Sequence, residues 1–171
     1  VGHHLRAAIE ARGAACVGVD LPGSGAELEV DLSAPDFDAA GLAKLAGHVD
    51  LVIYMAAKIT RGSSVDADAR SNLRTISEAP ARLLEALPKD VHLVLCSTFK
   101  MYGPPDHDGP IDPSNPPQSP DPHSYGSAKF LAERLMEISA ARRGHRFAVV
   151  RPSCISGPGP HAHNASPRVP R

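Results

Sequence analysis

The feature that most constrains the fold of this chain is a series of short apolar segments separated by stretches with helical character. Five segments have the length of a strand and lack the strict alternation of a strand with one solvated face: 14–20, 27–32, 50–56, 91–96 and 145–150. Four stretches have helical character: 5–12, 37–46, 67–87 and 124–142. Strands of this kind, alternating with helices, predict βαβ units and a parallel sheet covered by helices on both faces. The sequence therefore predicts an α/β fold.

The composition argues against several classes of partner. A length of 171 residues suits a single domain with a hydrophobic core. With 18 basic and 19 acidic residues, the chain has no excess of positive charge that would attract nucleic acid or an anionic membrane. The longest apolar runs have the length of a strand, and no secretion signal is visible. We therefore expect a cytoplasmic protein that binds neither nucleic acid nor a membrane.

The cysteines and histidines do not indicate a metal site. Cys16, Cys96 and Cys154 lie far apart, each in or just after an apolar run, which indicates reduced thiols rather than disulfides or zinc ligands. His161 and His163 form a His-x-His pair, but no cysteine or carboxylate lies close to them in the sequence. We expect no bound metal.

A tyrosine and a lysine stand four residues apart in the last predicted helix. Residues at this spacing lie on one face of a helix, so the ammonium of Lys129 can lie near the phenol of Tyr125. A neighbouring positive charge favours the phenolate and lowers the phenol pKa from about 10 toward the working pH. The pair therefore indicates a general acid/base for a substrate hydroxyl. The alternative is two polar residues on a solvated helix face.

Polar residues at the ends of the predicted strands favour a functional role for Tyr125 and Lys129. In parallel sheets, ligands bind beyond the carboxyl ends of the strands. The polar residues at or after these ends are Asp20, Asp31, Lys58, Ser97 and Thr98. The segment 103–122 is dense in Pro, Asp and Ser, which predicts an irregular loop that can fold over a ligand.

Four motifs, taken together with Tyr125 and Lys129, resemble those of a known family. They are the end of a glycine-rich turn at Val1–Leu5, a strand end with small residues at Tyr54–Ala57, a Ser/Thr-rich strand end followed by Tyr-Gly at Cys96–Gly103, and an Arg-Pro strand end at Arg151–Pro158. Over nearly its whole length the chain resembles the extended short-chain dehydrogenase/reductase family, specifically its NAD-dependent epimerase/dehydratase group.

The resemblance implies an incomplete Rossmann-like domain. Its doubly wound parallel sheet is expected to lack the first strand, and Gly2 is expected to be the third glycine of the turn that follows that strand. Because the first strand lies in the middle of such a sheet, residues 14–20 and 50–56 are expected to flank a gap. Residues 1–160 would form the NAD-binding domain, and residues 161–171 a polar tail leading into an absent substrate domain.

The resemblance also implies that the cofactor is NAD. Asp20 is expected to accept hydrogen bonds from the adenosine ribose diol and to repel a phosphate there, and no arginine follows it in Leu21–Gly25. NAD is therefore favoured over NADP, although Asp20 can also be read as a strand-end acid that starts a turn. The other residues implied to bind the cofactor are Gly2, Asp31, Leu32, Ala56, Ala57, Lys58, Asn72, Tyr125, Lys129 and Ser153. For Asn72, a polar helix residue is the alternative.

Three residues are implied to carry the chemistry. Thr98 lies five residues before Gly103, where the family places the hydroxyl that holds the substrate oxygen beside the tyrosine. The resemblance makes Tyr125 the acid/base and Lys129 the residue that lowers its pKa and binds the nicotinamide ribose. The neighbouring hydroxyl, Ser97, is not expected to take the role of Thr98.

The implied function is that of an NAD-dependent oxidoreductase or epimerase acting on a nucleotide sugar or a similar hydroxyl-bearing substrate. Phe99 and Lys100 stand where nucleotide-sugar dehydratases carry an Asp-Glu pair, so dehydration is not expected. Two alternatives stay open, namely a nucleotide-sensing protein of the same fold without catalysis and an inactive truncated product. The substrate, the choice between epimerase and dehydrogenase, and the presence of a homodimer are also open at this point.

Overall fold

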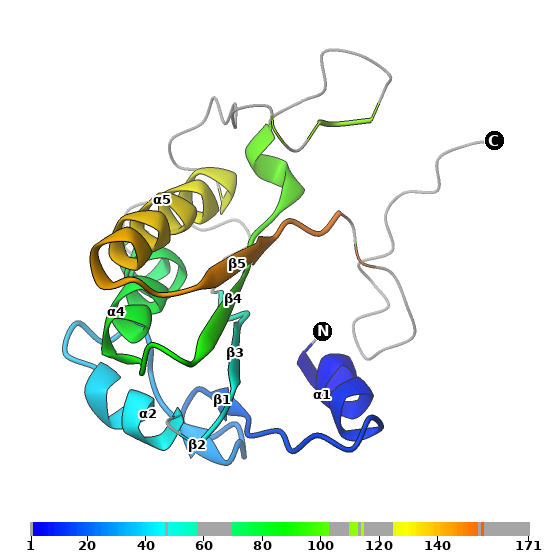
Figure 1. Cartoon of the computed structure of the whole chain (residues 1–171), viewed down its shortest axis with the longest axis vertical. Coiled ribbons are helices and arrows are strands. Elements are labelled where there is room, and N and C mark those ends of the chain that lie inside the picture. Colours follow the sequence, from blue (N-terminus) through cyan, green and yellow to red (C-terminus); the bar gives the residue numbers. More distant parts are fainter. Residues whose placement is uncertain are drawn as a thin grey trace.

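A computed structural model describes residues 2–46, 48–57, 70–102, 110–112, 114, 125–153 and 155. From β2 onward strands and helices alternate along the chain as the sequence predicts, whereas β1 is followed directly by β2 (Figure 1). In order, the elements are α1 (Gly2–Glu10), β1 (Val19–Asp20), β2 (Leu28–Glu29), α2 (Ala39–Ala46), β3 (Leu51–Tyr54), η1 (Arg74–Glu78), α4 (Ala79–Ala86), β4 (His92–Cys96), η2 (Phe99–Tyr102), α5 (Tyr125–Arg143) and β5 (Phe147–Val150).

The five strands belong to two separate parallel sheets. One sheet has the order β3-β4-β5, with Tyr54 opposite Leu95 and Cys96 opposite Val150. The other is the short pair β1-β2. The segments expected to flank a gap therefore lie in different sheets, and among the described residues no ladder joins β1 to β3.

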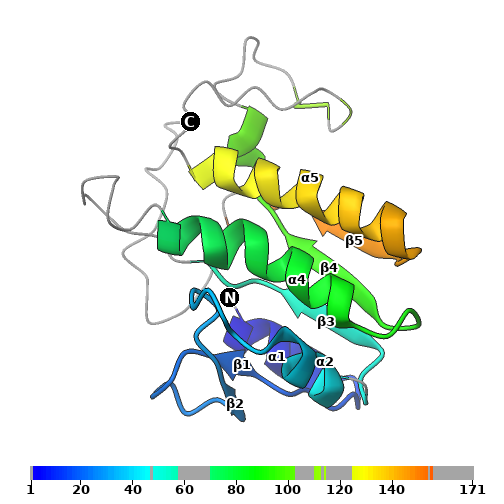
Figure 2. The ribbon, with the colours of Figure 1, turned by 90° about the vertical axis from the view of Figure 1, so that its left-hand side faces the viewer.

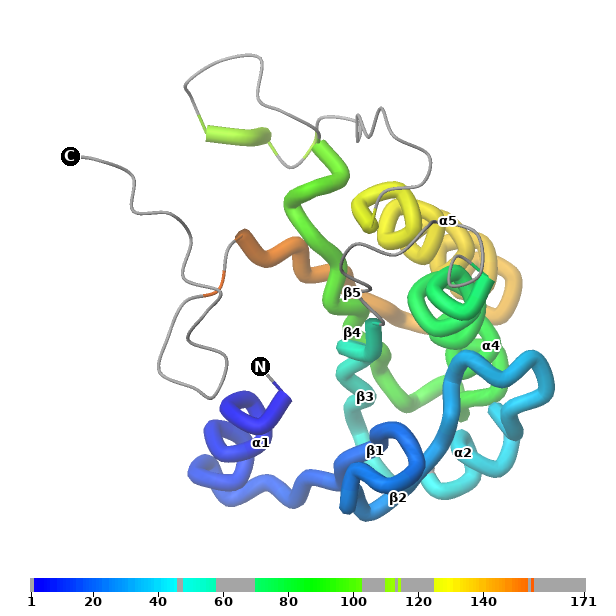
Figure 3. The backbone as a smooth tube through the Cα atoms, turned by 180° about the vertical axis from the view of Figure 1, so that it is seen from behind, coloured from blue at the N-terminus to red at the C-terminus, as the bar shows by residue number. Residues whose placement is uncertain are grey.

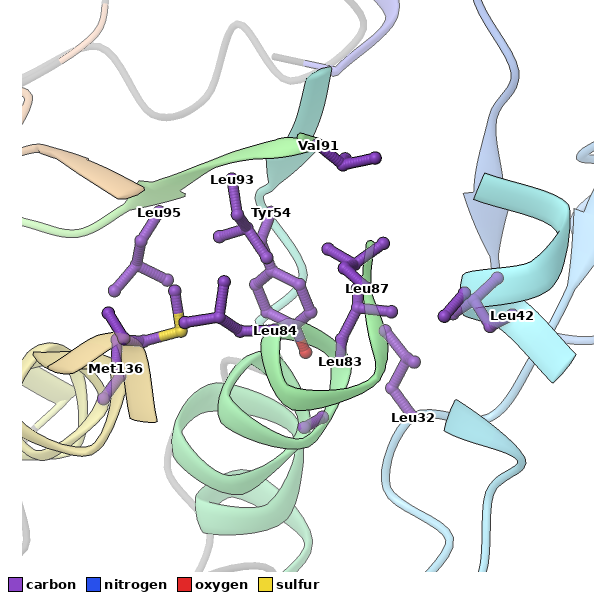
Figure 4. Packing of buried hydrophobic residues seen from close by; sticks show 14 of the residues in the cluster. Leu32, Leu42, Tyr54, Leu83, Leu84, Leu87, Val91, Leu93, Leu95 and Met136 are labelled. Carbon is purple, nitrogen blue, oxygen red and sulfur yellow. The ribbon is translucent and has the colours of Figure 1, made fainter. Parts of the chain in front are cut away.

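The core lies between the three-stranded sheet and the helices on one of its faces. Leu93 and Leu95 of β4 are fully buried and point toward α4 and α5, where they meet Leu84 and Met136 (Figure 4). The helices α4 and α5 run side by side over this face (Figure 2). Burying such apolar side chains contributes on the order of 1.5–3 kcal/mol each, so this layer holds the β4 strand end in place.

The second face of the sheet departs from the expectation of a helix layer on both sides. Helix α1 lies on that side, apart from the other helices (Figures 1 and 3), but none of its side chains is buried. On β4 the buried residues Leu93 and Leu95 alternate with half-buried ones such as Val94. The apolar side chains Leu5 and Ile9 of α1 are only half-buried, so among the described residues this helix covers its side of the sheet less completely than α4 and α5 cover theirs.

The helix before β4 adapts to a proline at an interior position. The sequence places Pro80 inside a helix predicted over 67–87, where a proline removes one hydrogen bond and its ring crowds the preceding turn. The described helix widens into the π-helical turn η1 directly before this residue, and the Ala79 N–H donates to the Arg74 carbonyl. Helix α4 then begins with Pro80 in its first turn, a position that tolerates proline. Residues 67–69 lie outside the described part.

Candidate active site

The first part of the candidate site is the carboxyl end of β4. The Ser97 N–H donates to the Val150 carbonyl at 2.8 Å, and the Phe99 N–H donates to the Pro152 carbonyl at 3.3 Å, so the chain after β4 stays beside the chain after β5. Thr98 is buried, and its Oγ1 accepts a hydrogen bond from the Lys100 N–H at 3.3 Å. The hydroxyl therefore sits at the start of η2, just beyond the strand end.

The second part of the candidate site is the first turn of α5. Tyr125 is the first residue of this helix, and the Lys129 ammonium nitrogen lies 5.7 Å from the centroid of its ring. The same ammonium donates to the Cys96 carbonyl oxygen at 2.7 Å, although the residue is only 1% exposed. The structure therefore brings Tyr125 and Lys129 together and fastens them to the strand end that leads into Thr98.

A glycine permits this close approach of α5 to η2. A Cβ atom on Gly126 would lie 2.9 Å from the Lys100 carbonyl oxygen, closer than real Cβ atoms come to backbone. The hydroxyl of Ser77 on η1 donates to the Ala128 carbonyl at 2.8 Å and holds the same turn from the other side. The start of α5 is thus fixed between η1 and η2.

Burial sets the pKa values of the pair, and it opposes part of the sequence prediction. It lowers the pKa of Lys129 to about 8, against the opposing effects of Cys96 and Glu133. It also raises the pKa of Tyr125, and the electrostatic interaction with Cys96 raises it further. The sequence predicted a lowered pKa for this phenol, and that direction is wrong, because burial disfavours the charged phenolate.

An ion pair that the sequence reasoning missed lies one turn further along α5. The Arg151 guanidinium donates from Nε to Glu133 Oε1 at 3.0 Å and from Nη2 to Glu133 Oε2 at 2.6 Å, and its Nη1 donates to the Tyr102 hydroxyl. The carboxyl of Glu133 is buried, and the pKa of Arg151 is raised above its ordinary value, chiefly by this pair. A signal in the sequence was the acid four residues after Lys129, which continues the face defined by Tyr125 and Lys129.

The expected adenosine end of the cofactor site lies on the β1–β2 pair. Asp20 ends β1 with an exposed carboxylate whose Oδ1 accepts a hydrogen bond from the Leu21 N–H at 2.8 Å. Its partner across the pair is Glu29, whose carboxylate accepts hydrogen bonds from the Gly23 and Gly25 N–H groups at 2.9 and 2.8 Å. Both glycines have positive φ, which turns these amides toward Glu29. The turn after β1 is therefore organised by carboxylates.

The remaining candidate residues divide between the two sheets. Asp31 follows β2 and accepts hydrogen bonds from the Ser33 N–H and hydroxyl, whereas Leu32 is buried in the hydrophobic core. Gly2 opens α1. Ala56 and Ala57 follow β3 and are half-buried, Asn72 is half-buried in the helical stretch before η1, and Ser153 is exposed beyond β5. Lys58 lies outside the described residues.

The hydrogen bonding of Lys129 bears on whether these positions suit a dinucleotide. Lys129 is buried beside Tyr125, and only one of its three ammonium hydrogens has an acceptor among the described residues, the Cys96 carbonyl. Small residues, Ala56 and Ala57, stand at the neighbouring strand end. A buried ammonium that has donor capacity beyond the Cys96 carbonyl suits the hydroxyl pair of a ribose.

Three further features bear on other classes of function. Within the described ranges, no group of three or more metal-binding side chains comes together, and His161 and His163 lie outside those ranges. Cys16 and Cys96 carry free, half-buried thiols. None of the helices among the described residues has both the length and the apolar character needed to cross a bilayer.

Comparisons with known proteins identify the family to which this chain belongs. The model of the NAD dependent epimerase/dehydratase family matches residues 1–171. The solved structure of MoeE5 in complex with UDP-glucose and NAD is 26% identical, with a TM-score of 0.64; the similarity covers 86% of this chain and 48% of that one. RMD from Pseudomonas aeruginosa, complexed with NADPH, is 26% identical with a TM-score of 0.68, over 95% of this chain and 52% of that one.

A putative epimerase from Burkholderia cenocepacia shares the fold at 21% identity, with a TM-score of 0.74 over 96% of this chain and 54% of that one. The chain thus spans about half the length of the solved structures it matches. No curated protein matched the chain. The family and the Rossmann-like α/β fold predicted from the sequence are confirmed.

Proposed function

The chain belongs to the NAD-dependent epimerase/dehydratase family, and we propose that its site at Thr98, Tyr125 and Lys129 oxidises a hydroxyl group of a nucleotide sugar. The observation that carries this proposal is the buried Lys129, which lies beside Tyr125 and donates to the carbonyl of Cys96 at 2.7 Å. This contact fastens the tyrosine helix to the strand end that leads directly into Thr98. The three side chains thus come from two elements locked to each other.

Each residue takes one task in the proposed reaction. Tyr125 accepts the hydroxyl proton in oxidation and returns a proton to the carbonyl oxygen in reduction. Thr98 donates a hydrogen bond that holds the substrate oxygen beside Tyr125. Lys129 binds the nicotinamide ribose and places positive charge near the phenol. NAD, when bound, accepts the hydride and gives it back.

The phenol of Tyr125 has an ordinary pKa of about 10, and burial raises it further. At neutral pH the phenol is protonated, so it is ready to donate a proton rather than to accept one. Ribose hydroxyls placed next to Lys129 would replace part of the lost hydration of its ammonium and support its charge, which in turn favours the phenolate. We therefore propose that cofactor binding prepares Tyr125 for oxidation.

We propose NAD rather than NADP for this chain. The support is the exposed carboxylate of Asp20 at the end of β1, where a ribose diol can donate hydrogen bonds and a phosphate would be repelled. The similar solved structures include complexes with either cofactor, since MoeE5 carries NAD and RMD carries NADPH. The cofactor assignment therefore depends on residues of this chain.

The remaining expectations belong to the same proposal. We assign NAD binding to residues 1–160 and infer a cytoplasmic enzyme that works as an epimerase or a dehydrogenase, with a homodimer as one state to test. The nucleotide sugar is inferred from the UDP-glucose complex of MoeE5. The non-catalytic nucleotide-binding alternative predicts NAD binding without turnover.

Two measurements on the full chain test the proposal. Calorimetric titration with NAD should give saturable binding, and incubation with NAD and UDP-glucose should give either NADH or an epimerised sugar, observed by absorbance and by NMR. Absence of NAD binding would contradict the proposal as a whole. Binding without any conversion of several UDP-sugars would favour the nucleotide-sensing alternative.

A further inference from the structure

Arg151 connects three chain segments that each carry a candidate site residue. It binds Glu133 on α5 and Tyr102 on η2, and it lies itself just beyond β5. Tyr102 follows Thr98 by four residues and Glu133 follows Lys129 by four. We propose that Arg151, Glu133 and Tyr102 form a positioning network, which holds α5 and η2 in the register that places Tyr125 and Lys129 against Thr98. This inference rests on the proposed function.

The geometry of the ion pair suits positioning. Glu133 is 1% exposed, so its carboxylate has given up water and depends on Arg151 for compensation. Both carboxylate oxygens accept from the guanidinium, at 3.0 and 2.6 Å. Two parallel hydrogen bonds fix a direction as well as a distance, which a single lysine ammonium cannot do. The pair therefore sets the rotation of α5 about its own axis.

The network adds a third fixed point to α5. The first is Gly126, which lies against the backbone of Lys100, and the second is the contact of Lys129 with the Cys96 carbonyl. Glu133 supplies the third point, on the same helix face and one turn further along. Three points along one face fix both the position and the rotation of the helix. A shift of about 1 Å between reacting groups can cost about 10²-fold in rate.

The network also acts on the proposed site electrostatically, through its effect on the pKa of Lys129. The groups that face the Lys129 ammonium are Cys96 from β4 and Tyr125 and Glu133 from α5, and the carboxylate of Glu133 favours the charged amine. Arg151 in turn neutralises Glu133. Removing either partner should therefore change the pKa of Lys129, and in opposite directions, a result that a purely structural ion pair elsewhere would not give.

The first experiment measures turnover of UDP-glucose with NAD by the full chain. We expect Arg151→Lys and Tyr102→Phe to lower kcat, by about tenfold or more for the lysine variant, with KM for NAD changed by less than about threefold. Tyr102→Phe should add little to Arg151→Lys, because both act through one guanidinium. The matched control is Glu137→Gln, which breaks the exposed Arg134–Glu137 pair on the same helix and should leave kcat unchanged.

The second experiment needs no activity. The pKa of Lys129 is read by NMR from lysine labelled at the ε-carbon, with an assignment variant at Lys129. We expect Glu133→Gln to lower this pKa below about 8 and Arg151→Met to raise it. If Glu133→Gln or Arg151→Met does not fold, two milder variants replace it. They are Tyr102→Phe, which removes only a hydroxyl, and Arg151→Lys, which keeps the positive charge.

The two experiments separate this inference from the proposed function. If the wild-type chain turns over no UDP-sugar, the proposed function fails, and opposite displacements of the Lys129 titration would still support the network. A Lys129 titration unmoved by both Glu133→Gln and Arg151→Met overturns the inference. So does a kcat for Arg151→Lys that equals the wild-type value while NAD binding and turnover are intact.

Discussion

The three-stranded sheet and the β1–β2 pair use the same parallel pairing but differ in what surrounds them. Leu95 in β4 is fully buried under α4 and α5, whereas Val19 in β1 is 40% exposed. Helix α5, which carries the proposed acid/base Tyr125, packs on the first sheet, and the proposed adenosine end lies on the second. The proposed catalytic residues are therefore held by apolar packing around the three-stranded sheet. The residues proposed to contact the cofactor ribose are held by polar contacts around the β1–β2 pair.

The carboxylate contacts of α1 and of the β1–β2 pair are exposed to solvent. Arg6 of α1 pairs with Glu10 and Glu27, and Glu29 holds the amides of the turn after β1. Exposed ion pairs contribute only about 0–1 kcal/mol each. The two regions are joined through α4, where Arg82 donates to the Pro35 and Phe37 carbonyls and stacks on the Phe37 ring. The N-terminal region is therefore expected to open before the sheet that carries Thr98 and Tyr125.

The largest effect expected from this difference is on stability. Leu95→Ala removes a fully buried side chain and should lower the free energy of unfolding by about 2–5 kcal/mol. Val19→Ala at an exposed position should change it by about 0.5 kcal/mol or less. Urea unfolding followed by circular dichroism gives both values. Equal losses would contradict the division into a packed region and a solvated one.

The next largest effect is on catalysis. Tyr125→Phe keeps the ring that Lys129 approaches but removes the hydroxyl, and it should lower turnover by at least about 10²-fold, the usual scale for a lost general acid/base. The NAD affinity should persist, because the helix and Lys129 remain in place. Turnover with UDP-glucose and calorimetric NAD binding are measured on the same preparation. Wild-type turnover in the variant would remove Tyr125 from the mechanism.

A smaller effect is expected at the β1–β2 pair. Asp20→Ala should weaken NAD binding by about tenfold or more and weaken NADP binding less, because a hydrogen bond to a charged group contributes about 1.5–3 kcal/mol. Competitive titration of NAD against NADP gives the ratio. Asp36→Ala, at an exposed acid before α2, carries the same change of charge and is the control. A wild-type chain that prefers NADP would overturn the role given to Asp20.

The contrast between the regions also explains which parts of the fold the sequence could predict. The prediction of 91–96 as a strand agrees closely with β4 at His92–Cys96, because the apolar run that indicates the strand is local in the sequence. The predictions of 14–20 and 27–32 are much longer than β1 and β2. The length of a strand depends on the ladder beside it, and the residues of β1 do not encode what lies on their other side.

The same limit applies to the site. The four-residue spacing of Tyr125 and Lys129 correctly predicted that they meet, because helix geometry alone determines it. The direction of the Tyr125 pKa was predicted wrongly, because burial arises from the packing of α5 against other elements. The pair of Arg151 and Glu133 was missed for a similar reason, since its partners are 18 residues apart and on different elements.

The smallest effect is expected in acid, and it distinguishes the two regions without any ligand. Glu27 has a pKa lowered to about 2, chiefly by Arg6 and then by backbone N–H groups, and the pKa of Glu29 is lowered by the Gly23 and Gly25 N–H groups. A carboxylate whose folded pKa is depressed stabilises the fold above its ordinary pKa of about 4.5, and this contribution is lost as the pH falls through the folded value. The N-terminal region should therefore loosen between about pH 4.5 and pH 2.

Amide NMR can follow this loosening residue by residue. The Gly18 N–H donates to Glu27 at 2.9 Å, and the Gly23 N–H donates to Glu29 at 2.9 Å, so each amide reports on one carboxylate. Both should lose protection from exchange as the pH falls, while the amide of Leu95, inside the three-stranded sheet, keeps it. Glu27→Gln is the matched control, because it should abolish the acid step at Gly18 and leave the step at Gly23. Simultaneous loss of protection at Leu95 would show that the two regions unfold as one cooperative unit, and that the carboxylates around the β1–β2 pair help to hold the catalytic sheet together.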